Sequence, residues 1–168
     1  MDWLARFFGQ PSSRYRNFQL VFLFFTLNFI FPSLSYAVSP DTAYAGFLKV
    51  GAFLWSAPYP KAEDSYFWRF LGASNVFCLG AMCLFLQIDL KRYYPILPSL
   101  LILKAGTSLQ FLVHFAFVLH HPSFLVIGLY DALTCAGFVW FARSAHRDGE
   151  ARGWKGLVPA PRSSRGAA

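Results

Sequence analysis

Four ionisable residues lie within long apolar segments, and these are the positions at which the sequence could support chemistry: Arg69, Lys104, His114 and Asp131. A charge at the centre of a transmembrane helix costs about 3 kcal/mol, so it persists where it is paired, hydrated or used. Asp131 and His114 could act as acid/base groups, with Arg69 as a charge stabiliser, on a lipophilic substrate. They are therefore the candidate catalytic residues.

Residues equidistant from a hairpin turn lie at similar depth in two antiparallel helices. Counting from the turn at His120-His121 puts Asp131 level with Gln110 and within one turn of His114. Counting from the preceding turn brings Arg69 to the same layer. We therefore expect Arg69 to pair with Asp131, and we expect Arg69, Gln110, His114 and Asp131 to line a ligand site.

These residues also have structural interpretations. Arg69 lies one turn into its segment and could extend its guanidinium to the membrane interface. His114 could be a hydrogen-bonded core histidine, and Lys104, on the flank of its helix, could reach the polar interface. Asp131 cannot reach the interface, so it is either a structural partner of Arg69 or Lys104 or has a functional role.

Small residues recur on one face of the segment 66–88, where they allow close approach of another helix. Gly80 lies on this face, so we expect it to border the ligand and a bulky replacement to exclude it. The walls of the predicted cavity are the Phe-rich faces of the helices.

The elements that must position these residues are transmembrane helices. The chain is 56% hydrophobic and 20% aromatic but only 14% charged, and a helix needs about 20 mainly apolar residues to span a bilayer. Four segments meet this requirement: 17–38, 66–88, 95–119 and 122–142. The sequence predicts an all-α, four-helix transmembrane bundle forming one membrane domain, residues 1–146.

Two further segments differ from the spans. Residues 43–55 are apolar but too short to cross, which predicts an interfacial or re-entrant helix between the first two spans. Residues 147–168 are rich in Arg, Gly, Pro, Ser and Ala, which predicts a disordered cytoplasmic tail.

Basic residues are retained on the cytoplasmic side of a membrane, so their distribution predicts orientation. Most of these basic residues lie near the two termini and in the turn at 89–94, which predicts cytoplasmic termini in an inner membrane. The net charge of +7 then follows from topology and attraction to membrane lipids, without nucleic acid. One alternative stays open at the N-terminus, where Ser35-Tyr36-Ala37 could be a signal-peptide cleavage site that would leave three spans.

Cofactor chemistry finds little support. Haem needs two histidines from different helices at one depth, whereas His114, His120 and His121 come from one helix end and His146 lies at the opposite side. A zinc site lacks a third ligand, and all three cysteines fall inside apolar segments. We therefore expect no metal and no cofactor.

The stretch Arg69-Phe70-Leu71-Gly72, followed by Gly80, a short basic turn and a third helix carrying Lys104, resembles the DoxX-like family of small bacterial membrane proteins. The segment 40–48 has a similar placement after the first helix. This resemblance covers helices one to three. It implies a four-helix protein of the cytoplasmic membrane, often without an assigned reaction, and it carries over no role for Asp131 or His114.

Three functions remain open at this point. The first is a protein that binds a lipophilic small molecule or accompanies a larger membrane complex, or a homo-oligomer, without demonstrable catalysis. The second is an enzyme that uses acid/base chemistry on an isoprenoid, sterol-like or quinone-like substrate. The third is a small proton-coupled transporter with Asp131 as its coupling carboxylate.

Overall fold

The computed structural model describes residues 9–55, 66–155 and 157, and the regular structure in this part of the chain is helical. Within these described residues, four helices are long and apolar enough to cross a membrane. They are α2 (Ser13–Val38), α4 (Tyr66–Ile88), α6 (Leu97–Phe117) and α7 (Pro122–Ala151). The protein is a multi-pass membrane protein, and the predicted all-α four-helix bundle is confirmed.

Helix boundaries follow local capping. The bounds of α4 coincide with those predicted. The first span begins before residue 17 because the Ser12 hydroxyl accepts a hydrogen bond from the backbone N–H of Tyr15 at 3.1 Å. The third begins after residue 95 because α5 (Leu90–Tyr93) and the 3-10 helix η1 (Tyr94–Ile96) first turn the chain.

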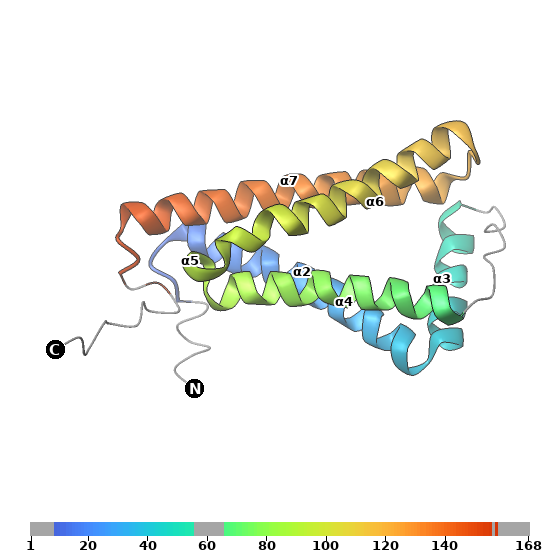
Figure 1. Ribbon diagram of the computed structural model, residues 1–168, viewed down its shortest axis with the longest axis horizontal. Helices are drawn as coiled ribbons and strands as arrows, with labels where there is room; N and C mark the ends of the chain where they lie inside the picture. Colours follow the sequence, from blue (N-terminus) through green and yellow to red (C-terminus); the bar gives the residue numbers. More distant parts are fainter. Residues whose placement is uncertain (1–8, 56–65, 156, 158–168) are drawn as a thin grey trace.

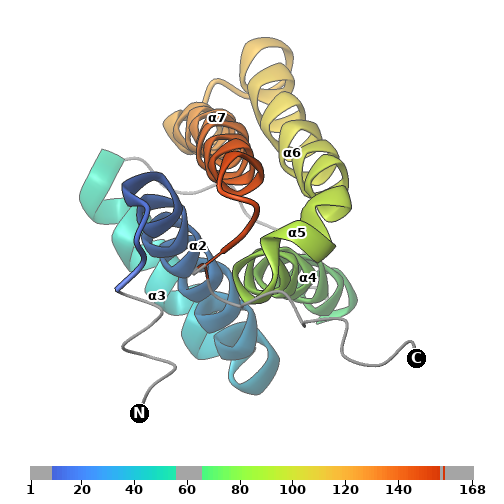
Figure 2. The same ribbon diagram turned by 90° about the vertical axis from the view of Figure 1, so that its left-hand side faces the viewer.

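The long helices form two pairs, α2 with α4 and α6 with α7, and α2 also packs against α7 (Figures 1 and 2). Helix α2 begins and α7 ends at the end of the bundle where α5 lies (Figure 1). Toward the opposite end the two pairs diverge. This arrangement places α2 between α4 and α7, where one of its faces becomes the core.

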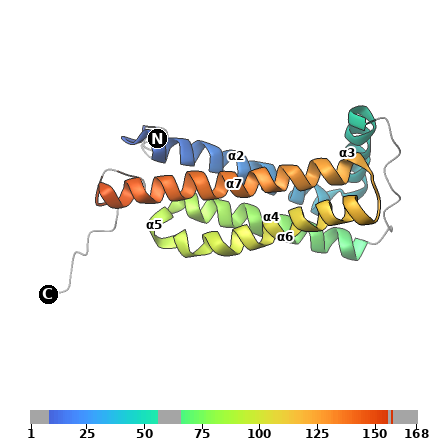
Figure 3. The ribbon, with the colours of Figure 1, turned by 90° about the horizontal axis from the view of Figure 1, so that it is seen from above.

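Helix α3 (Pro40–Trp55) lies across this opposite end, transverse to the four long helices (Figures 1 and 3). Tyr44 and Leu48 are half-buried, whereas Phe53 is 87% exposed. A transverse apolar helix at a bundle end suits the interfacial alternative predicted from the sequence rather than the re-entrant one.

Aromatic side chains at helical spacing form the core. Phe18, Phe22, Phe25 and Phe29 are buried along one face of α2, and ring centroids of Phe22 and Phe25 lie 5.4 and 4.9 Å from that of Phe138 on α7. These rings fill the space between the helices. The Phe-rich faces of the helices were expected to line a cavity, but this face of α2 packs against Phe138 of α7.

A polar cluster joins α2 to α4 within this core. The Gln87 side-chain amide donates to the Phe22 carbonyl at 3.1 Å and to the Thr26 hydroxyl. The Gln19 amide donates to the Gln87 carbonyl at 3.0 Å. Hydrogen bonds between helices satisfy groups that hydrocarbon cannot, so they fix the register of this pair.

The predicted tail begins later than expected. Helix α7 continues to Ala151, and Gly153 and Trp154 then adopt left-handed backbone angles, φ 60° and 62°, which reverse the chain. The Trp154 ring folds back onto Gly149, and Leu157 is buried. The prediction of a disordered tail rested on its average composition, in which two large apolar residues carry little weight. The burial of Trp154 and Leu157 holds the first part of the tail against the bundle. Residues 158–168 lie outside the described residues.

Reporter fusions test the predicted orientation. A reporter inserted after Arg92 or appended at the C-terminus should behave as cytoplasmic, and one near Lys61 as external, because basic residues resist translocation. The intact mass of the same preparation should correspond to a chain that begins at Met1. An external signal at Arg92 would contradict the predicted orientation. A mass that corresponds to a chain beginning at Val38 would mean that the first span is cleaved.

Candidate functional site

A buried ion pair joins α6 to α7. The Lys104 Nζ lies 2.5 Å from Oδ1 of Asp131, and the Thr107 hydroxyl donates to Asp131 Oδ2 at 2.7 Å. The two charged side chains are only 10% and 5% exposed. Each carboxylate oxygen thus has a donor, which is the condition under which an ion pair persists in a dry interior.

The face of α6 that carries Lys104 explains its burial. The buried residues of this helix follow one stripe: Leu97, Leu100, Lys104 and Ser108. Lys104 therefore lies at the centre of the buried face, and the prediction that it extends from the flank to the interface is wrong. Its ammonium also lies 4.8 Å from the ring centroid of Phe29, so the pair contacts α2 as well.

The close approach of α6 and α7 begins one turn from the pair. A Cβ on Gly128 would lie 2.7 Å from Leu112 Cγ, and the Ser108 hydroxyl donates to the Gly128 carbonyl at 2.8 Å. Glycine at this position lets the backbones approach, which brings Lys104 and Asp131 within reach of each other.

The hairpin count placed Asp131 level with Gln110, but its hydrogen-bond partner on α6 is Thr107. Asp131 is therefore level with a residue about one turn farther from the α6–α7 connection than predicted. Helix α6 ends at Phe117 and α7 begins at Pro122. The connection between them is not helical, so the centre of the hairpin lies nearer α6 than His120-His121. His114 is seven residues beyond Thr107, or about 10 Å along the axis.

The backbone of Arg69 is part of α4, but the structure does not describe its side chain. Its pairing with Asp131 therefore stays a prediction. The partners that the structure gives to Asp131 are Lys104 and Thr107. Of these, Thr107 could be placed on the polar stripe of its helix from sequence, and Lys104 was the alternative basic partner of Asp131.

Gln110 and His114 lie together in a separate pocket, near the end of the α6–α7 pair where the two helices are connected. This pocket has a volume of about 450 Å³ and is lined by Gln110, Phe111, Val113, His114, Val118 and Phe124. The His114 ring lies edge-on to Phe124, with 4.7 Å between centroids. Asp131 does not line it. The two candidate acid/base residues therefore lie apart: Asp131 is in the ion pair with Lys104, and His114 lines this pocket.

Gly80 lies at a contact between helices. A Cβ there would be 2.6 Å from Ile30 Cγ1 and 3.3 Å from the Ile30 backbone nitrogen. The space beside Gly80 is therefore occupied by α2, and the structure does not bring this glycine to the pocket of His114.

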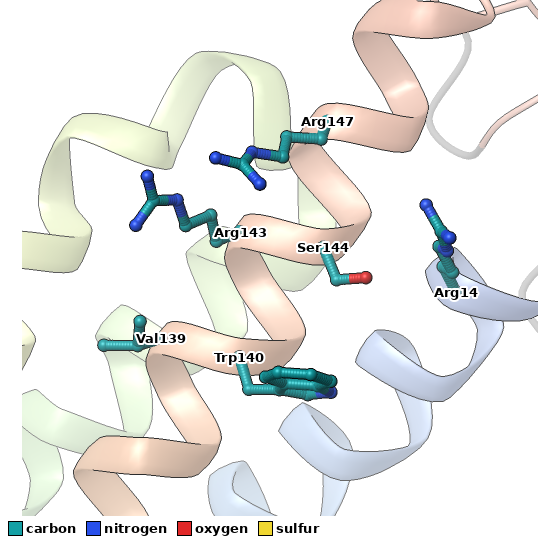
Figure 4. A pocket seen from close by; sticks show the side chains of 6 residues that line it. All are labelled: Arg14, Val139, Trp140, Arg143, Ser144 and Arg147. Atoms are coloured by element: carbon teal, nitrogen blue, oxygen red, sulfur yellow. The ribbon is translucent and has the colours of Figure 1, made fainter.

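A third group of side chains was not foreseen. Arg14 from α2 and Arg143, Ser144 and Arg147 from α7 line a concavity at the end of the bundle near α5 (Figure 4). From sequence these arginines indicated orientation only. Their common position depends on α2 packing beside α7, which the order of helices along the chain does not reveal.

Comparisons of this chain with family models, with curated proteins and with solved structures found no match.

Proposed function

We propose that the protein binds an elongated lipophile in the pocket of Gln110 and His114 without transforming it. The supporting observation is the make-up of this pocket, whose walls are mainly apolar and whose polar side chains are an amide and an imidazole. Apolar pockets with a few polar groups are typical of small-molecule sites. Gln110 and His114 orient the polar group of the lipophile, while Phe111 and Phe124 contact its hydrocarbon.

Binding is favoured over the enzyme and transporter alternatives by the state of Asp131. Both alternatives need this carboxylate to exchange a proton, yet Lys104 and Thr107 occupy its two oxygens. His114 lines a pocket that Asp131 does not reach. A substrate at His114 would therefore have one titratable side chain within the described lining, and no second group to complete an acid/base pair.

The cellular setting is part of the same proposal. The excess of basic residues near both termini and the second turn supports an inner-membrane protein with both termini cytoplasmic. Kinship with DoxX-like proteins rests on Arg69-Phe70-Leu71-Gly72, Gly80 and Lys104. The exposed apolar faces of the helices suit a homo-oligomer or a larger membrane complex as well as lipid.

Retention of a co-purifying lipophile tests this function. Native mass spectrometry and solvent extraction of the purified protein should detect a bound lipophile. His114→Ala should weaken its affinity about fivefold, the effect of losing about 1 kcal/mol of hydrogen bonding, and so lower the fraction of protein that retains it. His120→Ala is the matched control, because His120 is exposed and does not line the pocket. A wild-type protein without any lipophile, or equal losses in the two variants, would contradict the proposal.

A further inference from the structure

The concavity lined by Arg14, Val139, Trp140, Arg143, Ser144 and Arg147, here called the arginine pocket, has a volume of about 500 Å³. It lies between the beginning of α2 and the last part of α7, so two distant parts of the chain contribute its charges (Figure 4). It is separate from the pocket of His114 and shares no residue with it.

The three guanidinium groups have no carboxylate partner among the ion pairs of residues 9–55 and 66–155. Asp148 binds Arg152 at 2.9 Å, and Glu150 lies 3.6 Å from His146. The acidic residues closest to the pocket along α7 are thus engaged by other side chains. The arginine pocket is left with a positive charge that an anion would balance.

The depth of the arginines indicates which anion is available. Arg143 and Arg147 lie about 18 and 24 Å along α7 from Asp131, and Arg14 lies about 22 Å along α2 from Phe29, by helical rise. Asp131 and Phe29 both contact Lys104 and so mark one level near the middle of the spans. Half the hydrocarbon thickness is about 15 Å. The three guanidinium groups therefore lie at the level of lipid headgroups.

The other lining residues complete a lipid-shaped site. Val139 and Trp140 lie one turn toward the membrane from Arg143, and Trp140 is 73% exposed. Indole rings favour the boundary between hydrocarbon and headgroups. The Ser144 side chain lies between the α7 arginines and Arg14 (Figure 4), where its hydroxyl can donate to an anion.

We propose that the arginine pocket binds the phosphate of an anionic phospholipid. The guanidinium groups of Arg143 and Arg147 donate paired N–H bonds to phosphate oxygens, which arginine does with well-matched geometry. Arg14 lies on the other side of Ser144 (Figure 4) and adds positive charge to the pocket. The acyl chains follow the apolar surface of Val139 and Trp140 toward the hydrocarbon. The site therefore selects phosphatidylglycerol-like lipids over zwitterionic ones, and it ties α2 to α7 at this end of the bundle.

Lipid retention measured by native mass spectrometry tests this proposal. The full chain is transferred from mixed vesicles of phosphatidylglycerol and phosphatidylcholine into detergent, and the two bound lipids are counted. The wild type should retain phosphatidylglycerol preferentially. Arg143→Gln and Arg147→Gln should each lower the ratio of retained phosphatidylglycerol to phosphatidylcholine about fivefold, since an arginine near anionic lipid contributes about 1 kcal/mol. Unchanged helix content and melting temperature would show that each variant is folded.

Arg16→Gln is the matched control, because Arg16 is also exposed near the start of α2 but does not line the pocket. Its retention of phosphatidylglycerol should equal that of the wild type. Equal losses in Arg16→Gln and Arg143→Gln would mean diffuse surface attraction and would overturn the site. A third arm adds inorganic phosphate at millimolar concentration. Failure of phosphate to displace the lipid supports the proposal, whereas full displacement would identify a site for a small soluble anion instead.

Discussion

Neutralising either member of the Lys104–Asp131 pair is expected to destabilise the bundle by about 3–5 kcal/mol. Asp131→Leu leaves a buried ammonium without its counter-ion, and Lys104→Met leaves a buried carboxylate with Thr107 as its remaining donor. Removing one partner of a buried pair costs this much because the other charge stays in a dry environment. Reversible unfolding in mixed micelles, followed by circular dichroism, measures the loss.

The double variant Lys104→Met/Asp131→Leu should recover most of that stability, since it buries apolar groups of similar size and no charge. The resulting double-mutant cycle reports the coupling between the two residues. Strictly additive losses would show that the pair contributes nothing jointly. The same cycle with Arg69→Gln in place of Lys104→Met tests the pair predicted from the sequence, because coupling there would require Arg69 to share Asp131.

The number and position of the spans could be predicted because a bilayer imposes a length and a polarity on each helix. The bounds of α4 illustrate this, since the apolar run ends at Ile88 and a charged turn follows at once. Helix ends set by local hydrogen bonds were predicted less well. The Ser12 cap extends α2, and at the end of α7 the buried Trp154 ring folds back onto Gly149 of the same helix.

The partner of Asp131 was harder to predict because depth and angle both matter. Hairpin counting gives depth to within about one turn, and in one turn the direction of a side chain rotates through a full circle. Lys104 was placed on a flank, yet it occupies the centre of the buried face of α6. The angular assignment treated Lys104 as lying beside the polar stripe of Thr107 and His114, whereas Lys104 and Thr107 both contact Asp131 on α7.

Gly80→Leu is expected to destabilise the protein by about 1–3 kcal/mol through overpacking, and by more if the helices cannot separate. Even a Cβ would meet Ile30 Cγ1 at 2.6 Å, and two further atoms of α2 lie at 3.3 Å, one of them the Ile30 backbone nitrogen. The Ile30 side chain can rotate away, but its backbone can move only with α2. The substitution should therefore push α2 from α4 and weaken the Gln87–Thr26 contact nearby.

Gly72→Leu provides the control on the same helix, because a Cβ at Gly72 would meet no atom of the described residues within 4 Å. Both substitutions remove a glycine from α4 and add the same side chain, so helix propensity and added apolar surface are matched. Unfolding in mixed micelles should show a loss at Gly80 and little change or a gain at Gly72. Equal effects would mean that α2 and α4 do not approach closely at Gly80. A loss of lipophile from a fully stable Gly80→Leu variant would instead restore Gly80 to the ligand site predicted from the sequence.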